Sequence, residues 1–333
     1  MQGQIFKIHS DYYYVNADGK VLECRLRDVL KKRGESMLVG DIVEIERTGA
    51  ERGVIVGISG RKNSLPKPKV ANVTGVVIVS AMKEPEPDFE QLDRYICLCE
   101  YHGLKPVLCF NKTDLAEDEE RLAERIRGIY EPCGYKCIFM SARENNGGRE
   151  LFEILRGKLS VFCGGSGVGK STVINLLSSG ELNLKTGEVS DKTGRGTHTT
   201  RHCEIFGIFE NSYVVDTPGF SNMKFDFLMP TEVAKLYPEL RGAKCRYSDC
   251  LHVSEDGCEV KEKGLFASPE RYSGYLKFVE EAKAYKEKVT YSGRKVEDRS
   301  KINNDKVVAK ISKNRRAVSR KTEKQNIKRE EEF

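Results

Sequence analysis

A glycine-rich segment of the 333-residue sequence has the residue types and spacing of a phosphate-binding loop. It lies directly after the apolar run 159–163 and before a helix-like segment at 170–177. Glycines let backbone amides turn toward phosphate oxygens, and the dipole of the following helix also favours an anion there. The loop and the first residues of the helix are Gly164, Gly165, Ser166, Gly167, Val168, Gly169, Lys170, Ser171 and Thr172.

Two side chains of this segment have the chemistry to assist phosphoryl transfer. Lys170 is expected to reach the β- and γ-phosphates and to stabilise the charge that develops when the γ-phosphate is attacked. The Ser171 hydroxyl is expected to bind Mg²⁺. We therefore predict a nucleoside triphosphate site that works with Mg²⁺.

An acidic motif, Asp216-Thr217-Pro218-Gly219, follows the apolar run 213–215. Phosphate-loop enzymes place the carboxylate that holds Mg²⁺ at such a strand end. We expect Asp216 to hold Mg²⁺ through water and the Gly219 amide to contact the γ-phosphate. A plain turn is the alternative interpretation of an aspartate before Pro-Gly, and the nearby phosphate loop favours the functional one.

The choice of base depends on a third motif, which ends the strand predicted over residues 106–110. Asn111-Lys112-Thr113-Asp114 resembles a guanine-recognition sequence, because the Asp114 carboxylate can accept from both N1–H and the N2 amine of guanine. Adenine lacks that amine and would leave the carboxylate partly unpaired. We expect Lys112 to cover one face of the base and Asn111 to tie this loop to the phosphate loop.

Ser141-Ala142, at the end of the strand predicted over 136–140, resembles the second base loop of GTPases, with the Ala142 amide available to guanine O6. An Asn-Lys-x-Asp match alone is common at helix starts, and its pairing with Ser141-Ala142 is what favours GTP. In ordinary GTPases the phosphate motifs precede the base motifs, whereas here the base motifs come first. The order predicts a circularly permuted GTPase.

The glutamine that usually orients the attacking water is absent from its usual place. Ras-like enzymes carry it just after the Asp-x-x-Gly motif, where this chain has Phe220. A glycine- and threonine-rich loop at 194–200 offers the nearest replacement. We expect His198 to orient or accept a proton from water, and Thr200, or otherwise Thr199, to bind Mg²⁺ and the γ-phosphate. A surface histidine without a catalytic role is the alternative.

Four potential metal ligands lie close together in a short segment after residue 230. Cys245, Cys250, His252 and Cys258 supply three thiolates and one imidazole, a closed set typical of structural Zn²⁺. The segment is too short to bury a core of its own, so zinc is expected to contribute much of its folding free energy. Scattered reduced cysteines are the alternative interpretation.

The elements that position these residues begin with a β-rich N-terminal domain, residues 1–65. Five short β-rich stretches without a convincing helix are typical of a small closed barrel, and an OB-fold is the commonest of that size. Such barrels often bind nucleic acid, although a structural barrel has the same pattern. The expected strands are 4–9, 12–16, 21–25, 41–46 and 53–58.

Residues 66–230 are expected to form the α/β P-loop GTPase domain, and a basic stretch with two prolines, 61–72, is expected to be an extended linker. Apolar runs alternate with helical patterns, which indicates a parallel sheet covered on both faces. Ligands bind at the carboxyl ends of such strands, where the motifs lie. The expected strands are 76–79, 106–110, 136–140, 159–163, 204–209 and 213–215, and the expected helices are 89–101, 116–130, 149–155 and 170–177.

Residues 231–290 are expected to form a zinc-binding, α-rich domain, and residues 291–333 a basic, disordered tail. Residues 301–333 hold 11 Lys and Arg against 5 Asp and Glu, a surplus that equals the +6 of the whole chain. Such a tail suits a phosphate-rich partner, and a solvated tail without a partner is the alternative. One helix face in the zinc domain is predicted from Tyr272, Tyr275, Leu276, Val279 and Ala282.

Composition excludes membrane and secreted classes. The chain is 39% hydrophobic and 32% charged, with a mean hydropathy of −0.50. No run approaches the ~18 apolar residues of a membrane span, and the N-terminus has no signal-peptide pattern. Several of the 11 cysteines lie in apolar runs, as reduced thiols do. We expect a cytoplasmic protein with no membrane partner.

These motifs, in this order, resemble the RsgA (YjeQ-type) family of GTPases over nearly the whole chain. The resemblance implies hydrolysis of GTP to GDP and phosphate, stimulation by the small ribosomal subunit, and a role late in the maturation of that subunit. It also implies that the barrel contacts ribosomal RNA, that the zinc domain docks as well, and that His198 is catalytic. We expect a monomer. An RNA-binding scaffold that uses GTP as a structural ligand and a P-loop ATPase are the alternatives.

Overall fold

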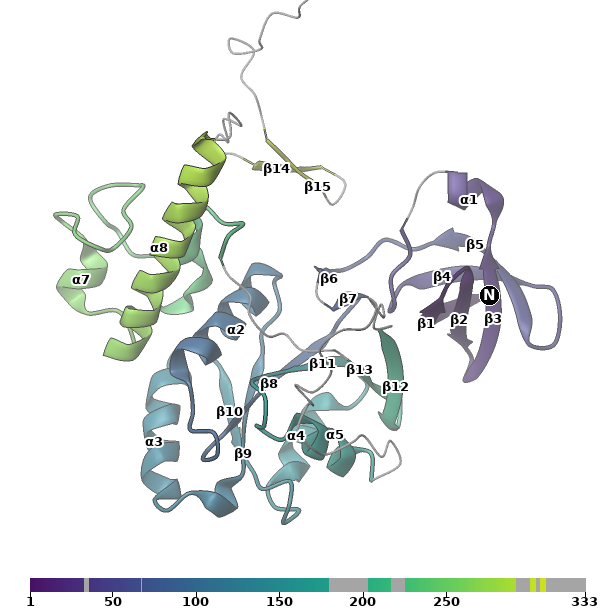
Figure 1. The fold of residues 1–333 in the computed structure, drawn as a ribbon, viewed down its shortest axis with the longest axis horizontal. Helices are drawn as coiled ribbons and strands as arrows, with labels where there is room; N and C mark the ends of the chain where they lie inside the picture. Colours follow the sequence, from purple (N-terminus) through teal and green to yellow (C-terminus); the bar gives the residue numbers. More distant parts are fainter. Residues whose placement is uncertain are drawn as a thin grey trace, which may run out of the picture.

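The structure is a computed structural model, and three parts follow one another along it: a barrel, a central α/β part and a C-terminal helical part (Figure 1). The C-terminal part lies against the central part (Figure 1). The predicted multidomain architecture is confirmed. The structure describes residues 1–32, 36–66, 68–179, 203–216, 225–291, 300–303 and 306–309.

Five strands form the N-terminal barrel. Strand β1 pairs with both β2 and β4, β2 pairs with β3, and β5 lies between β3 and β4, so the sheet closes on itself. Alternate residues point inward, and Ile5, Val15, Leu22, Val43 and Ile55 are buried in the core. The predicted five-stranded barrel is confirmed. The strands are β1 (Gln2–His9), β2 (Tyr12–Ala17), β3 (Lys20–Leu26), β4 (Ile42–Arg47) and β5 (Arg52–Ile58).

The residues between the barrel and the central part form a β-hairpin, where the sequence predicted an extended linker. The Asn63 side chain donates to the Val73 carbonyl at 2.8 Å and accepts from the Val73 amide at 2.9 Å. Leu65 and Val70 are buried in the central core, and this burial outweighs the effect of the two prolines. A short helix also interrupts the barrel, which was expected to have none. These elements are α1 (Asp28–Lys32), β6 (Ser64–Pro66) and β7 (Lys69–Ala71).

Six strands form the central sheet, in the order β10-β9-β8-β11-β13-β12. The first five are parallel, as predicted, but β12 runs antiparallel to β13. The prediction of a fully parallel sheet is wrong at this edge, because only Glu210 and Asn211 separate the two strands and a crossover needs a far longer connection. The strands are β8 (Gly75–Ala81), β9 (Val107–Asn111), β10 (Lys136–Phe139), β11 (Leu159–Cys163), β12 (Glu204–Phe209) and β13 (Ser212–Asp216).

Helices cover both faces of this sheet, as predicted. Helices α2 and α3 pack on one face through Leu92, Ile96 and Ile126. Helices α4 and α5 pack on the other through Leu151 and Val173. The helix predicted over 116–130 begins later, after a separate 3₁₀ turn. These elements are α2 (Phe89–Tyr101), η1 (Thr113–Leu115), α3 (Glu119–Tyr130), α4 (Gly148–Leu155) and α5 (Lys170–Leu177).

The barrel and the central sheet are joined edge to edge. Strand β1 pairs antiparallel with β12, with Lys7 opposite Glu204, and the two side chains form an ion pair at 2.8 Å. Because β12 also pairs with β13, where Glu204 lies opposite Asp216, two strand pairings connect the barrel to the predicted Mg²⁺ carboxylate.

The C-terminal part packs on α2 through the long helix α8. Tyr275, Val279 and Ala282 of α8 are buried in one apolar core with Cys97 and Leu98 of α2, which confirms the predicted helix face. Within the described ranges no helix combines the length and apolar character that a bilayer crossing needs. The elements are α6 (Pro230–Val233), η2 (Ala234–Leu236), η3 (Pro238–Leu240), α7 (Glu259–Lys263) and α8 (Pro269–Tyr291).

Two short strands lie in the stretch that the sequence predicted to be disordered. Strands β14 (Ser300–Asn303) and β15 (Lys306–Ala309) pair antiparallel. The sequence predicts no strands here, and the expected disordered tail over residues 291–333 stays a prediction. The apolar run of β15 is only Val307-Val308-Ala309, which is too short for periodicity to predict a strand within a basic stretch.

A buried ion cluster joins α8 to α2. Arg271 of α8 is 1% exposed; its Nε donates to Glu239 at 2.7 Å and a terminal nitrogen donates to Asp93 of α2. The rings of Tyr130 and Tyr237 lie 5.4 and 5.0 Å from the guanidinium carbon. Burial raises the pKa of Asp93 to about 7 against the opposing charge of Arg271, and Glu239 adds to the rise. One cation thus faces two carboxylates in this cluster.

Removing the cation of this cluster should lower the free energy of unfolding more than removing an exposed cation from the same helix. Arg271→Met leaves two buried carboxylates without a counter-charge, so we expect the free energy of unfolding to fall by about 3–5 kcal/mol. Lys277→Met breaks an α8–α2 ion pair with Glu90 whose lysine is 61% exposed, and we expect little change. Urea unfolding of both variants tests this, and equal losses would contradict a special role for the buried cluster.

Candidate nucleotide-binding site and metal centre

The phosphate loop connects β11 to α5 in a conformation that depends on glycine. Gly164 has a φ of +146°, and a Cβ there would lie 2.0 Å from the Val79 carbonyl oxygen. Gly169 has a φ of +90°, and a Cβ there would lie 2.3 Å from the Asn111 amide nitrogen. The loop therefore packs against the ends of β8 and β9 at distances that no other residue permits.

Lys170 begins helix α5 and folds back into the loop. Its ammonium donates to the carbonyls of Gly164 at 3.0 Å and Gly165 at 2.5 Å. Burial lowers the pKa of Lys170 below its ordinary value. Ser166 and Gly167 are exposed on the loop, and Ser171 and Thr172 are half-buried in the first helical turn. The tip of the loop is thus exposed, and the Lys170 ammonium is held by two carbonyls of the same loop.

Asn111, the last residue of β9, connects the phosphate loop to the second base loop. Its side-chain amide donates to the Val168 carbonyl at 3.1 Å, and its side-chain oxygen accepts from the Ala142 amide at 2.9 Å. Asn111 is 2% exposed, so both hydrogen bonds are shielded from water. The three sequence motifs that contain these residues are therefore brought together at the carboxyl ends of the central strands.

Asp114 lies beside Ser141 in this arrangement. The Ser141 hydroxyl donates to one carboxylate oxygen of Asp114 at 2.6 Å and accepts from the Glu144 amide at 3.2 Å. Lys112, in the left-handed region with a φ of +64°, donates to the Glu84 carbonyl of the loop after β8. These contacts orient Asp114 and place the Lys112 stem along the loop between β8 and α2.

A cavity of about 340 Å³ lies beside the phosphate loop, between β8 and α2. Gly165 and Ser166 line it on one side, and Gln91 and Tyr95 of α2 line it on another. Gln91 and Tyr95 belong to none of the predicted motifs, and the base-loop residues Asp114 and Ser141 do not line this cavity.

The Mg²⁺ side of the predicted site is described only by its backbone. Asp216 is the last residue of β13, which runs parallel to β11, so its strand ends beside the phosphate loop. The predicted residues His198, Thr199, Thr200 and Gly219 lie outside the described residues.

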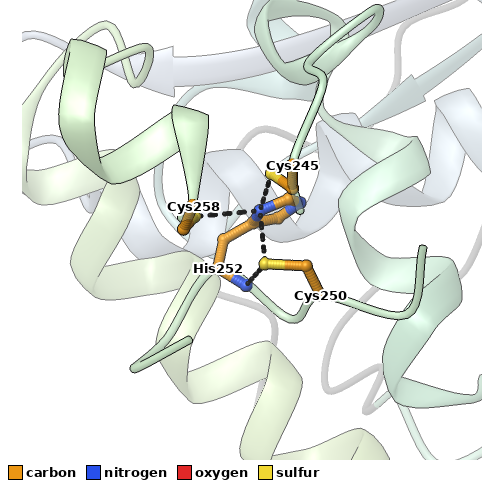
Figure 2. A group of neighbouring side chains, drawn as sticks. All are labelled: Cys245, Cys250, His252 and Cys258. Atoms are coloured by element: carbon orange, nitrogen blue, oxygen red, sulfur yellow. Dashed lines mark hydrogen bonds between the residues drawn. The ribbon is translucent and has the colours of Figure 1, made fainter. Parts of the chain in front are cut away.

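The four predicted metal ligands converge in the C-terminal part (Figure 2). The Nδ1 atom of His252 lies 3.6 Å from the sulfur of Cys245 and 3.5 Å from the sulfurs of Cys250 and Cys258. Ligand bonds of about 2.0–2.3 Å in a tetrahedron place neighbouring S and N ligands about 3.5 Å apart. The spacing therefore fits one tetrahedral metal ion, and the cluster can hold a metal.

The loop that carries His252 is held in shape by its neighbours. His252 has a φ of +58°, and the hydroxyls of Tyr272 and Tyr275 on α8 donate to the His252 and Leu251 carbonyls at 2.9 and 2.7 Å. The Glu255 carboxylate accepts from the amides of Leu251, Val253 and Ser254. Burial opposes ionisation, but these amides outweigh it and hold the pKa of Glu255 at about 2. The ligand geometry is thus supported by groups that are not ligands themselves.

A phosphate loop, guanine-type base loops and their order along the chain define the class: a circularly permuted, phosphate-loop nucleotide-binding protein. Residues 58–226 match the RsgA GTPase family, and residues 2–55 match the RsgA N-terminal domain. The chain therefore belongs to the RsgA family, which confirms the resemblance found in the sequence.

Individual relatives agree with this assignment. A Moorella thermoacetica protein named small ribosomal subunit biogenesis GTPase RsgA is 42% identical over 84% of this chain and 97% of its own length. A Geobacillus thermodenitrificans protein of that name is 41% identical, over 86% and 98%. The crystal structure of YjeQ from Thermotoga maritima has a TM-score of 0.75 at 34% identity, over 84% and 98%. The structure of YloQ, described as a circularly permuted GTPase, has 0.72 at 29%, over 85% and 95%.

Replacing Gly169 should disrupt the junction between the loops. In Gly169→Ala the new methyl would clash with the Asn111 amide, and the φ of +90° would be strained, so we expect nucleotide affinity to fall by at least about tenfold. Gly128→Ala, on helix α3 with open space around its Cβ position, should leave affinity unchanged. Titration of both variants with fluorescent GDP measures the effect. Wild-type affinity in Gly169→Ala would show that the loop adapts.

Removing one ligand should release the metal. In Cys250→Ser a hydroxyl replaces a thiolate, so we expect elemental analysis to find no bound metal and the C-terminal part to unfold at lower urea. Cys133→Ser is the matched control, because this buried thiol lies outside the cluster and its hydrogen bond to the Ile129 carbonyl can be kept by serine. Full metal content in Cys250→Ser would refute this ligand set.

Proposed function

We propose that this chain is a GTPase that hydrolyses GTP to GDP and phosphate, is stimulated by the small ribosomal subunit, and acts late in the maturation of that subunit. The observation that carries the proposal is the Asn111 contact with Val168 and Ala142, which joins a guanine-type base site to a phosphate loop. The names of relatives at 41–42% identity support the biological role. Asp114, held by Ser141, supports GTP over ATP, because its carboxylate matches two donors of guanine.

Water would attack the γ-phosphate in line, and the residues of the chain would bind and orient the reactants. Lys170 and the amides of the phosphate loop would stabilise charge on the β- and γ-phosphates. Ser171, Asp216 and Thr200, or Thr199 in its place, would hold Mg²⁺. When bound, Mg²⁺ neutralises charge on the phosphate oxygens. His198 would orient the water, since Phe220 can neither donate nor accept.

We assign Zn²⁺ to the cluster of Cys245, Cys250, His252 and Cys258. Three thiolates and one imidazole suit a closed tetrahedral zinc site, with no open position for a reaction. Its contribution is to folding: the ion would hold the ligand loop against α8.

The remaining assignments concern location and partners. We infer that the barrel, the zinc domain and the basic tail contact ribosomal RNA, and that the protein is a cytoplasmic monomer. The domain limits that we propose are residues 1–65, 66–230, 231–290 and 291–333. A cationic tail would add an electrostatic, salt-dependent component to binding.

GTP hydrolysis measured with and without purified small ribosomal subunits tests the proposal. We expect subunits to raise turnover, with ATP as a poor substrate. His198→Ala should lower the stimulated rate by about 100-fold or more and leave GTP affinity within about twofold, because the histidine acts on the water and not on the nucleotide.

Two outcomes would contradict the proposal. If subunits leave hydrolysis unchanged, the protein is better described as an RNA-binding scaffold that holds GTP. If ATP is bound as tightly as GTP, the base assignment to Asp114 fails.

A further inference from the structure

The buried ion cluster between α8 and α2 has more negative than positive charge when its acids are ionised. Arg271 of α8 faces two carboxylates, Asp93 of α2 and Glu239 of η3. The side chains of Arg271 and Asp93 are each 1% exposed, and that of Glu239 is 8% exposed. With both acids ionised, these three side chains have a single negative charge in excess. Water does not reach that charge, so its burial is unfavourable.

The two carboxylates differ in how many of their oxygens are hydrogen-bonded. Both oxygens of Glu239 accept from Arg271, at 2.7 Å from Nε and 3.1 Å from a terminal nitrogen. Only one oxygen of Asp93 accepts from Arg271; the other, Oδ2, is buried and has no hydrogen-bond partner among the described residues. Gly274 of α8 faces this oxygen, since a Cβ there would lie 3.8 Å from it. A proton on Oδ2 removes both the excess charge and the unsatisfied anionic oxygen.

The thiols and phenols that face Asp93 remain neutral when the pH changes near neutrality. Burial raises the pKa of Cys133 to about 12, and it raises the pKa of the other three groups above their ordinary values. Burial also raises the pKa of Asp93 to about 7; the charge of Arg271 opposes this rise and that of Glu239 adds to it. The four groups are Cys97 of α2, Tyr130 at the end of α3, Cys133 after it, and Tyr237 between η2 and η3.

We propose that packing of α8 on α2 puts a proton on Asp93, so that docking of the C-terminal part weakens as the pH rises above neutral. In the unfolded chain this carboxyl is ionised at neutral pH, so the folded protein binds one proton more than the unfolded one. The stability that this proton contributes is complete below the unfolded pKa and is lost as the pH rises through about 7. The inference concerns the contact between α8 and α2 and does not depend on the proposed GTPase function.

Urea unfolding of the full chain at about pH 6 and about pH 9 tests the proposal. Between these two values we expect the folding equilibrium constant of the wild type to fall by about tenfold more than that of Asp93→Asn. Asparagine keeps an oxygen for Arg271 and cannot ionise. Glu90→Gln is the matched control, because it removes a carboxylate of the same helix pair that is 37% exposed and contacts Lys277 of α8. It should keep the pH dependence of the wild type.

A second measurement needs no variant. Carboxyl ¹³C NMR of the wild-type protein, labelled at aspartate and assigned through backbone connectivity, reports the charge of Asp93 directly. We expect its signal to move from the protonated to the ionised position between about pH 6 and about pH 9. A signal in the ionised position over this whole range would overturn the proposal. So would a pH dependence of unfolding that is the same in Asp93→Asn as in the wild type, or one that Glu90→Gln removes equally.

Discussion

The nucleotide-binding site depends on one buried side-chain amide, that of Asn111. A buried carboxamide must satisfy both its donor and its acceptor, and Asn111 does so with the Val168 carbonyl and the Ala142 amide. It can do so only if the carboxyl ends of β9, β10 and β11 lie at the same end of the sheet, so that the loops that follow them meet. A Cβ at Gly169 would lie 2.3 Å from the nitrogen of the same amide, so this close approach requires glycine. The pairing of a base site with a phosphate site is thus imposed by local hydrogen bonding, and the order of the motifs along the chain is free to differ.

The circularly permuted order determines which parts of the chain are connected to the nucleotide-binding sheet. Strand β12 pairs with both the barrel strand β1 and with β13, so one edge of the nucleotide-binding sheet is continuous with the barrel. At the other side of the molecule, the chain that follows β13 continues into the part that holds the metal cluster and α8. The barrel is therefore connected by backbone pairing to the strand that carries Asp216.

Much of this arrangement could be predicted from the sequence, because it is encoded locally. The bounds of α2, α5, β11 and β12 follow directly from apolar periodicity, and the Cys/His spacing identified the metal ligands. Two features escaped prediction. The hairpin of β6 and β7 depends on the burial of Leu65 and Val70 in the core of the central part, which the local pattern does not report. The antiparallel edge follows from the two-residue connection between β12 and β13, a local signal that the expectation of a parallel sheet did not use.

Arg271 is a residue whose burial could not be predicted from the sequence. Its position near the start of a polar helix indicates a solvated residue, yet three-dimensional packing places it at 1% exposure between Asp93 and Glu239. Burial of a charged group is a property of its partners, which lie far away along the chain. Sequence periodicity reports which face of a helix is apolar and does not report which charge that face will cover.

Helix α8 connects these features physically. Its tyrosines Tyr272 and Tyr275 hold the carbonyls of the loop that carries His252, while its Arg271 and Glu281 bind α2. A single continuous helix transmits a displacement at one contact to the others, because helical hydrogen bonds resist local deformation far more than surface loops do. The metal cluster and the ion pairs to α2 therefore cannot be treated as separate stabilising units, because a metal ion that fixes the ligand loop also fixes the helix that binds α2.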